Sequence, residues 1–173
     1  ISRKKSANTY FEVHGKVYAF DSTTIDLCLS IFWWAKFRST KVGIKLHTLY
    51  DITTQIPAFV HITPAAVHDM NAMDVIPYEP EAYYIFDRGY MDFARLFKIT
   101  RHSAYFVIRA KRNLKIKIMQ DLRNTNSPEV IISDDLVRFV GFYSDLDYPE
   151  NFRRVRYYDT ETRRPFTYLT NNM

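Results

Sequence analysis

Short apolar runs separated by turn residues set the pattern of this chain, and they predict a protein built around a β-sheet. Residues 41–50 give the clearest alternation, with Val42, Ile44 and Leu46 on one face and Lys45 and His47 on the other. Four more runs in the first 110 residues are typical of strands: 16–22, 57–63, 82–87 and 104–108. This part of the chain therefore predicts five strands in all.

Helical spacing appears twice among these strands. A proline ends the third strand, and residues 65–75 then carry helical spacing with turn residues around them. In residues 92–102, Phe93, Leu96 and Phe97 recur at the i, i+3 and i+4 positions of one helix face. Three strands, a helix, a strand, a helix and a strand, in this order, predict a mixed α/β sheet rather than a sandwich or a helical bundle.

The pattern changes after residue 110. The remaining strand-like runs are short and rich in β-branched and aromatic residues: 116–119, 130–132, 136–142, 152–158 and 166–169. Turn residues at 124–128 and 148–151 separate several of them. We therefore expect a β-rich insertion over residues 111–165 that is not a continuation of the central sheet and contains no long helix.

Composition favours one globular unit. With 173 residues, 47% of them hydrophobic and 16% aromatic, the chain can bury a sizeable core but is short for two ordinary domains. Cys28 is the only cysteine, so no internal disulfide can form. No apolar run is long enough to span a bilayer, and the first five residues lack a signal-peptide pattern. We expect a cytoplasmic protein with no membrane partner.

The charge of the chain favours an anionic partner. Its formal net charge is +5, and its pI is near 9.2. The cations concentrate in three blocks: 36–45, 109–117, and 153–156 together with Arg163 and Arg164. Such blocks suit contact with a phosphate backbone, although each also fits an ordinary solvated strand face.

Two aspartates carry the strongest hint of chemistry. Asp21 and Asp87 each close an apolar run that is typical of a strand. A carboxylate in apolar surroundings costs several kcal/mol unless a cation, a metal or hydrogen bonds compensate it, so two such residues suggest a divalent metal site. The alternative is that one aspartate caps the next element and the other pairs with Arg88.

Other polar and aromatic residues are weaker candidates. The spacing of His61, His68 and Asp69 fits no common structural zinc site. Trp33 and Trp34 could stack on an exposed base, but core or interface packing is the favoured explanation.

Six short motifs in order resemble a known family. They are Asp-Ser-Thr at 21–23, Gly-Ile-Lys-Leu-His at 43–47, His-Asp at 68–69, Asp-Arg-Gly-Tyr at 87–90, the stretch 105–111, and Leu-Thr-Asn-Asn at 169–172. Together they resemble the catalytic region of bacterial insertion-sequence transposases, in particular the insertion-sequence-four family of DDE transposases. The resemblance runs from about residue 16 to the end of the chain.

The resemblance implies an α/β fold of the ribonuclease-H-like class, a mixed sheet flanked by helices with a β-rich insertion after the fifth strand. The expected division has four parts: an N-terminal lead-in segment (1–15), a core with the first two aspartates (16–110), the insertion (111–165), and a strand returning to the core (166–173).

In this family Asp21 and Asp87 would be the first two carboxylates of a site for two Mg²⁺ or Mn²⁺ ions. The third carboxylate, a Glu on a helix, is expected beyond residue 173, because neither Glu150 nor Glu161 matches the family signature. We therefore expect the chain to be an incomplete fragment that is inactive by itself.

The implied reaction is DNA cleavage followed by strand transfer, with double-stranded DNA of the transposon ends and of the target as partners. The residues expected to contact DNA are Lys45, His47, Arg88, Tyr90, Arg109, Lys111 and Arg112. A homodimer and a nucleoid location are expected for the full-length enzyme. A metal-dependent nuclease and a DNA-binding module without catalysis are the alternatives.

Overall fold

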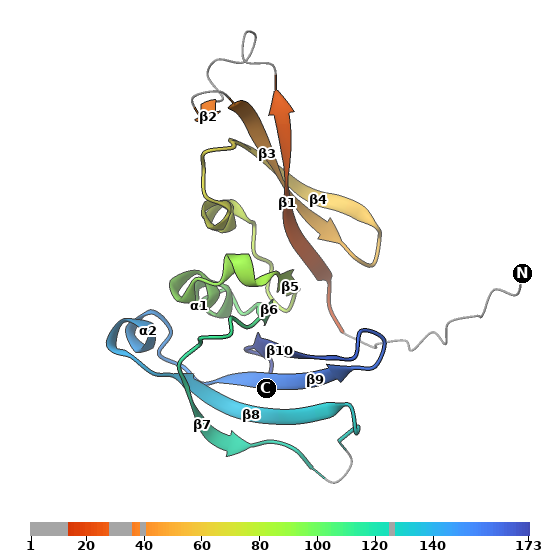
Figure 1. Ribbon diagram of the computed structural model, residues 1–173, viewed down its shortest axis with the longest axis vertical. Coiled ribbons are helices and arrows are strands. Elements are labelled where there is room, and N and C mark those ends of the chain that lie inside the picture. The colour runs from red at the N-terminus through yellow and green to blue at the C-terminus, as the bar shows by residue number, and fades with distance from the viewer. Residues whose placement is uncertain (1–13, 28–35, 39–40, 125–126) are drawn as a thin grey trace, which may run out of the picture.

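A computed structural model describes residues 14–27, 36–38, 41–124 and 127–173 (Figure 1). Its strands are β1 (Val17–Leu27), β2 (Lys36–Arg38), β3 (Lys41–Asp51), β4 (Ile56–Pro64), β5 (Tyr83–Phe86), β6 (Tyr105–Arg109), β7 (Ile116–Asp121), β8 (Ile131–Phe139), β9 (Phe152–Asp159) and β10 (Arg164–Thr170). Its helices are the 3₁₀ turns η2 (Asp69–Val75) and η3 (Arg88–Tyr90), and the α-helices α1 (Phe93–Arg101) and α2 (Phe142–Asp147). None of the described helices is long and apolar enough to cross a membrane.

All ten of these strands form one hydrogen-bonded sheet in the order β2-β3-β1-β5-β6-β10-β9-β8-β7, and β4 pairs with β3. β1, β3 and β4 are antiparallel neighbours, whereas β5 and β6 run parallel to β1. β10 then pairs antiparallel with β6 and joins the second half of the sheet to the first. This large, mostly stranded mixed sheet with few helices is compatible with a ribonuclease-H-like fold.

The core lies on one face of the sheet. Alternate strand residues are buried there: Tyr18, Phe20, Tyr84, Phe86, Phe106 and Ile108. Leu96 and Ile99 of α1 and Met73 of η2 complete this core. Figure 1 shows η2, α1 and α2 on the same side of the strands. The opposite face of the β1-β3-β4 part is only partly covered, and it exposes Ile25 and Ile62.

The predicted strands of the first 110 residues are present within a few residues of their expected bounds. The expected helix at 65–75 is instead the shorter 3₁₀ turn η2, which begins after His68, because His68 Nδ1 accepts a hydrogen bond from the amide of Met70 and caps it there. The runs at 130–132 and 136–142 form one strand, β8, and a six-residue helix, α2, follows it.

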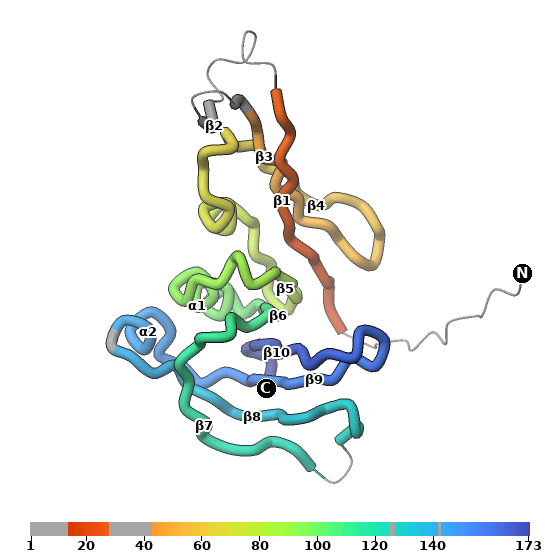
Figure 2. Tube along the Cα trace, viewed as in Figure 1, coloured from red at the N-terminus to blue at the C-terminus, as the bar shows by residue number. Residues whose placement is uncertain are grey.

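The insertion is rich in strands, but the expectation that it would not continue the central sheet is wrong. β9, β8 and β7 extend the sheet beyond β10. Figure 2 shows these segments following one another below β10. Two ion pairs join β8 to β9, between Asp134 and Arg153 and between Asp135 and Arg154. Both aspartates are buried, so these guanidinium groups compensate their charge.

An aromatic cluster ties the insertion to the core. Tyr148, which follows α2, is fully buried and packs its ring edge-on against Phe97 of α1 at a centroid distance of 5.4 Å. Its hydroxyl lies 3.0 Å from Thr100 Oγ1. Phe139 and Phe152 pack against each other at 4.2 Å and also contact Tyr148. The division of the chain into domains at residues 15, 110 and 165 stays a prediction.

Asn171 fastens the end of β10 to the core. Its Oδ1 accepts a hydrogen bond from the amide of Phe106 at 2.9 Å. Its Nδ2 donates to Thr100 Oγ1 at 3.0 Å and to the carbonyl of Ala104 at 2.8 Å. One side-chain amide therefore joins β10, β6 and the end of α1.

We expect Asn171→Ala to lower the free energy of unfolding by about 2 kcal/mol, because it removes three hydrogen bonds and leaves the amide of Phe106 without its partner. Urea denaturation followed by circular dichroism measures this change. Asn172→Ala is the control, since the Asn172 side chain donates only a long bond of 3.3 Å to the Tyr83 hydroxyl. Equal losses of stability in the two variants would contradict the assignment.

Candidate metal and DNA site

Asp21 and Asp87 occupy neighbouring positions on two parallel strands. β1 and β5 pair in a register that places Phe20 opposite Phe86. The two aspartates are the next residues along each chain, and Asp87 keeps an extended backbone with φ −73° and ψ 162°. Because side chains alternate along extended chain, both carboxylates lie on the sheet face opposite to the core.

Both aspartates are exposed, which corrects one step of the sequence argument. Asp21 lies inside β1, which continues to Leu27, and does not close the strand. Water can solvate both carboxylates, so no ion is required to compensate their burial. The case for a metal therefore depends on their adjacent positions and on the groups around them.

The capping and pairing alternatives are not supported. Asp87 precedes η3, yet its side chain makes no capping hydrogen bond. Asp21 Oδ1 accepts a bond from the amide of Ser22 at 2.8 Å. Among the described residues, no Lys, Arg or His nitrogen lies within 4.0 Å of either carboxylate, so Arg88 does not pair with Asp87. Their oxygens are available to a hard divalent cation.

A third aspartate, Asp69, contacts the residue that follows Asp21. Asp69 Oδ1 accepts a hydrogen bond from Ser22 Oγ at 3.1 Å and forms an ion pair with Lys45 Nζ at 3.0 Å. Lys45 also donates to the carbonyl of Val67 at 2.7 Å, and its side chain is 14% exposed. The ammonium group of Lys45 therefore makes its contacts within the protein, contrary to the expectation that Lys45 contacts DNA.

His47 is likewise excluded from direct contact with a phosphate. The alternation of β3 is present, but the face that carries Lys45 and His47 is the core face, and His47 is 0% exposed. Its Nε2 lies 2.9 Å from Thr63 Oγ1, and its ring stacks on Phe20. Burial lowers the pKa of His47, so the imidazole is held in its neutral form at pH 7.

Tyr90 is also turned away from solvent and is only 4% exposed. Its hydroxyl has no hydrogen-bond partner among the described residues. Burial raises the pKa of Tyr90 to about 12, and the charges of Asp69, Asp21 and Asp87 act in the same direction, whereas the Ser22 hydroxyl opposes them. Tyr90 thus lies within electrostatic range of the aspartates but inside the core, where it packs against Phe20 and Phe86.

Four of the expected DNA contacts line one pocket together. This basic pocket has a volume of about 360 Å³, and its cations are Arg88, Arg109, Lys111, Arg112, Arg154 and Arg156. Arg88 directly follows Asp87, so the pocket begins beside the aspartates. In the described parts of the chain, only Arg154 of this set has an acidic partner, Asp135 at 2.6 Å. The guanidinium of Arg109 lies 4.8 Å from the centre of the Phe166 ring, a cation–π contact that fixes its orientation.

The sequence missed the contribution of Arg154 and Arg156 to this pocket. The block at 153–156 was recognised as basic, but only the pairing of β9 with β10 and of β10 with β6 brings it next to residues 109–112. Strand alternation could have indicated that these two arginines act together, because Arg154 and Arg156 lie on one face of β9 and Arg153 lies on the other.

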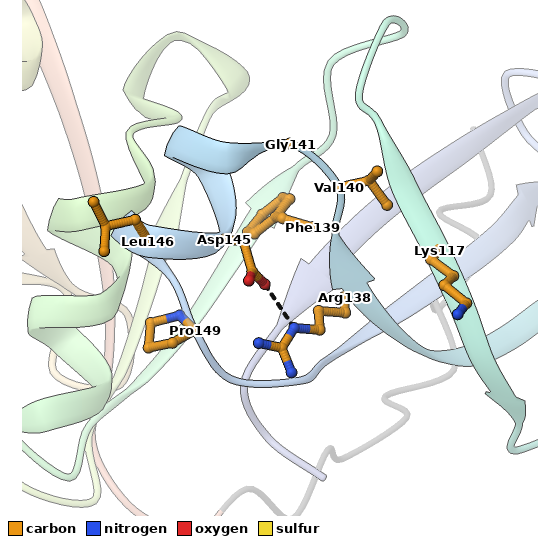
Figure 3. A pocket seen from close by; sticks show the side chains of 8 residues that line it. All are labelled: Lys117, Arg138, Phe139, Val140, Gly141, Asp145, Leu146 and Pro149. Carbon is orange, nitrogen blue, oxygen red and sulfur yellow. Dashed lines mark hydrogen bonds and ion pairs between the residues drawn. The ribbon is translucent and has the colours of Figure 1, made fainter.

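A second pocket lies elsewhere among the described residues. It has a volume of about 620 Å³ and is formed by β7, β8 and the segment around α2 (Figure 3). Its lining is mostly apolar, with an ion pair between Arg138 and Asp145 at 2.6 Å. It contains neither aspartate of the candidate site and none of the expected DNA contacts.

The described ranges contain no group of three His, Cys, Asp or Glu side chains that could hold a metal ion. The side chains of His61, His68 and Asp69 therefore do not form such a group. The same observation means that no third such side chain joins Asp21 and Asp87 among the described residues. The pair Trp33 and Trp34, Cys28, and most of the basic block at 36–45 lie outside the side chains that the structure describes.

Comparisons with known proteins indicate the family of the chain. The family model of the transposase DDE domain matches residues 14–173. A protein of Sinorhizobium fredii, named provisionally as transposase y4zB, is 33% identical over 157 residues, which cover 88% of this chain and 43% of that protein. A protein of Geobacillus stearothermophilus, named provisionally as the transposase of insertion sequence element IS5377, is 26% identical over 121 residues, 70% of this chain and 32% of that protein.

The chain spans less than half the length of these two relatives. The family model nevertheless covers nearly all of the chain, including both aspartates, the Asp-Arg-Gly-Tyr motif and the whole basic pocket. The chain therefore belongs to the DDE transposase family.

Proposed function

We propose that this chain contributes the first two carboxylates, Asp21 and Asp87, to the metal site of a transposase that cuts DNA and joins its ends to a target. The observation that carries the proposal is the parallel pairing of β1 and β5, which makes the two aspartates neighbours on one sheet face. Family membership supports the reaction class, and the adjacent aspartates support its place in this chain.

The carboxylate pair has the chemistry that this reaction needs. Asp21 and Asp87 would both hold hard divalent cations through their carboxylate oxygens. Bound Mg²⁺ or Mn²⁺ supplies a water activated for attack and stabilises the charge that develops on the leaving oxygen. Gly89 presents no side chain beside Asp87, and apart from its chain neighbours no heavy atom lies within 4 Å of the place where its Cβ would stand. This leaves room for a DNA backbone next to the carboxylate.

The basic pocket would hold the DNA backbone at a fixed distance from the aspartates. Arg88, Arg109, Lys111 and Arg112 remain our proposed contacts, and Arg154 and Arg156 join them. Phosphate contacts of this kind fix the register of DNA on a protein without reading its bases. We assign Lys45, His47 and Tyr90 no contact with DNA. The homodimer and the nucleoid location of the full-length enzyme stay predictions.

A DNA-binding module without catalysis is the second candidate. It is favoured by the absence of a third metal-ligating side chain beside Asp21 and Asp87 in the described ranges. Divalent-metal binding separates it from the enzyme. A metal-dependent nuclease of the same fold differs in its product, because a nuclease leaves hydrolysed ends and a transposase joins them.

We expect this chain to bind Mn²⁺ weakly and to leave supercoiled plasmid intact, because two carboxylates hold a hard cation less tightly than three or four. Asp21→Ala and Asp87→Ala should each abolish the remaining binding. Water-proton relaxation measures Mn²⁺ binding, and a plasmid-nicking assay with Mg²⁺ or Mn²⁺ measures cleavage.

Asp74→Ala is the control for the metal experiment, since Asp74 is an aspartate that already pairs with Arg95 at 2.7 Å. Strong nicking that both Asp21→Ala and Asp87→Ala abolish would show that another acid, such as Glu150 or Glu161, completes the site. Unchanged Mn²⁺ binding in both variants would refute the metal site itself.

The basic pocket generates a second prediction. The double variant Lys111→Ala, Arg112→Ala should weaken binding to a DNA duplex about tenfold at low salt. It should also lower the slope of log K against log salt by about 2, because each phosphate that a removed cation neutralised accounts for roughly one unit of that slope. Fluorescence anisotropy over a series of salt concentrations measures both quantities.

The matched control is Lys115→Ala, Lys117→Ala. These two exposed lysines belong to the same basic block in sequence but do not line the basic pocket. The control removes the same charge, so its smaller expected effect isolates the pocket. Equal weakening in the two double variants would mean that DNA is attracted by overall charge and not by this pocket.

A further inference from the structure

An apolar hollow and exposed apolar side chains lie together around α2. The hollow is the pocket of about 620 Å³ between β7, β8 and α2, and Val140, which lines it, is 47% exposed. Tyr143 and Leu146 of α2 are 77% and 69% exposed, the two highest values among the large hydrophobic side chains that the structure describes. We call the pocket and these three residues the α2 patch. Apolar surface gathered in this way marks a contact site.

The two sides of the α2 patch carry opposite charges. Lys115 and Lys117 lie on the β7 side, whereas Asp147 and Glu150 lie on the α2 side. All four side chains are exposed, and within the described ranges none has an oppositely charged partner within 4.0 Å. In Figure 3, Lys117 lies across the pocket from Leu146, the residue before Asp147. Such a patch matches a second copy of itself that is turned by a two-fold axis.

We propose that the α2 patch is the surface through which two copies of this chain form a symmetric dimer. The two-fold arrangement places Tyr143 and Leu146 of each copy against the pocket of the other copy. It also places the lysines on the β7 side opposite the acids on the α2 side. Arg138 and Asp145 of the pocket lining already pair with each other at 2.6 Å, so they bring no unpaired charge to the contact. This inference does not depend on the proposed metal site.

Other occupants fit the α2 patch less well. A DNA backbone would meet a mostly apolar lining and two unpaired acids, and the basic pocket offers it a better site. A different protein would need its own matching charges, whereas a second copy supplies them from the same residues. β7 is also the last strand at this end of the described sheet, so no further described strand separates the two copies.

Charge reversal tests the arrangement. The unmodified chain should dimerise with a Kd of roughly 10–100 µM, because a pocket and one short helix form a small interface. The double variants Lys115→Glu, Lys117→Glu and Asp147→Lys, Glu150→Lys should each weaken dimerisation at least about tenfold, since like charges then face each other. An equimolar mixture of the two variants should dimerise again, because each copy then meets opposite charges. Sedimentation velocity over a series of protein concentrations measures these equilibria.

Leu146→Ser tests the apolar part of the α2 patch. It should weaken dimerisation at least about tenfold, because the side chain of Leu146 no longer buries apolar area in the pocket of the other copy. Ile62→Ser is the matched control, since Ile62 is 58% exposed but lies on β4, outside the patch. We expect it to leave the Kd unchanged. The two variants lose apolar side chains of the same size, so their difference isolates the position.

Three results would overturn the proposal. A chain that stays monomeric at every concentration tested would show that the α2 patch serves another protein or none. Reversal variants that dimerise as tightly as the unmodified chain would place the interface elsewhere, and loss of the dimer in Ile62→Ser would place it on the open face of β1, β3 and β4. A mixture of the two reversal variants that remains monomeric would show that the two sides of the patch do not face each other.

Discussion

The parallel pairing of β1 with β5 is the constraint on which the site depends. It places Phe20 beside Phe86 in the core and, one residue further, Asp21 beside Asp87 on the open face. Alternation of side chains makes these two results inseparable, because a slip of one residue would bury the carboxylates and expose the phenyl rings. The hydrophobic core therefore fixes the register of the chemistry. Tyr90 adds to this coupling, since its ring contacts both phenylalanines.

Local periodicity was enough to predict helix α1 and five of the strands described in the first 110 residues, but not the short strand β2. The alternation of β3 and the i, i+3, i+4 spacing of Phe93, Leu96 and Phe97 each reflect burial of one face, and burial is what these elements depend on. The two aspartates could be singled out for the same reason, because they follow buried runs. The family motifs then supplied the reaction class, which no periodicity contains.

Exposure was harder to predict, since it depends on what covers each face. The pattern of β3 predicts that the face with Lys45 and His47 is exposed to solvent. In the structure η2 packs over this face, Asp69 of η2 pairs with Lys45, and His47 is buried beside Thr63. The continuous sheet was missed for a related reason. Pairing of β10 with β6 joins residues about 60 positions apart, and no local pattern encodes such contacts. The same pairing creates the basic pocket, so its full membership could not be predicted either.

The distribution of ion pairs is consistent with the proposed approach of DNA to the exposed carboxylates. Many cations of the insertion are already neutralised: Arg123 by Asp121, Arg138 by Asp145, Arg153 by Asp134, and Arg154 by Asp135. The basic-pocket residues Arg88, Arg109, Lys111, Arg112 and Arg156 have no such partner within the described ranges. A group of unpaired cations is thus gathered beside Asp87, in addition to unpaired cations elsewhere such as Lys115 and Lys117. Two exposed carboxylates repel a phosphate backbone, so a set of free cations next to them offsets this repulsion, and bound divalent ions would remove the remainder.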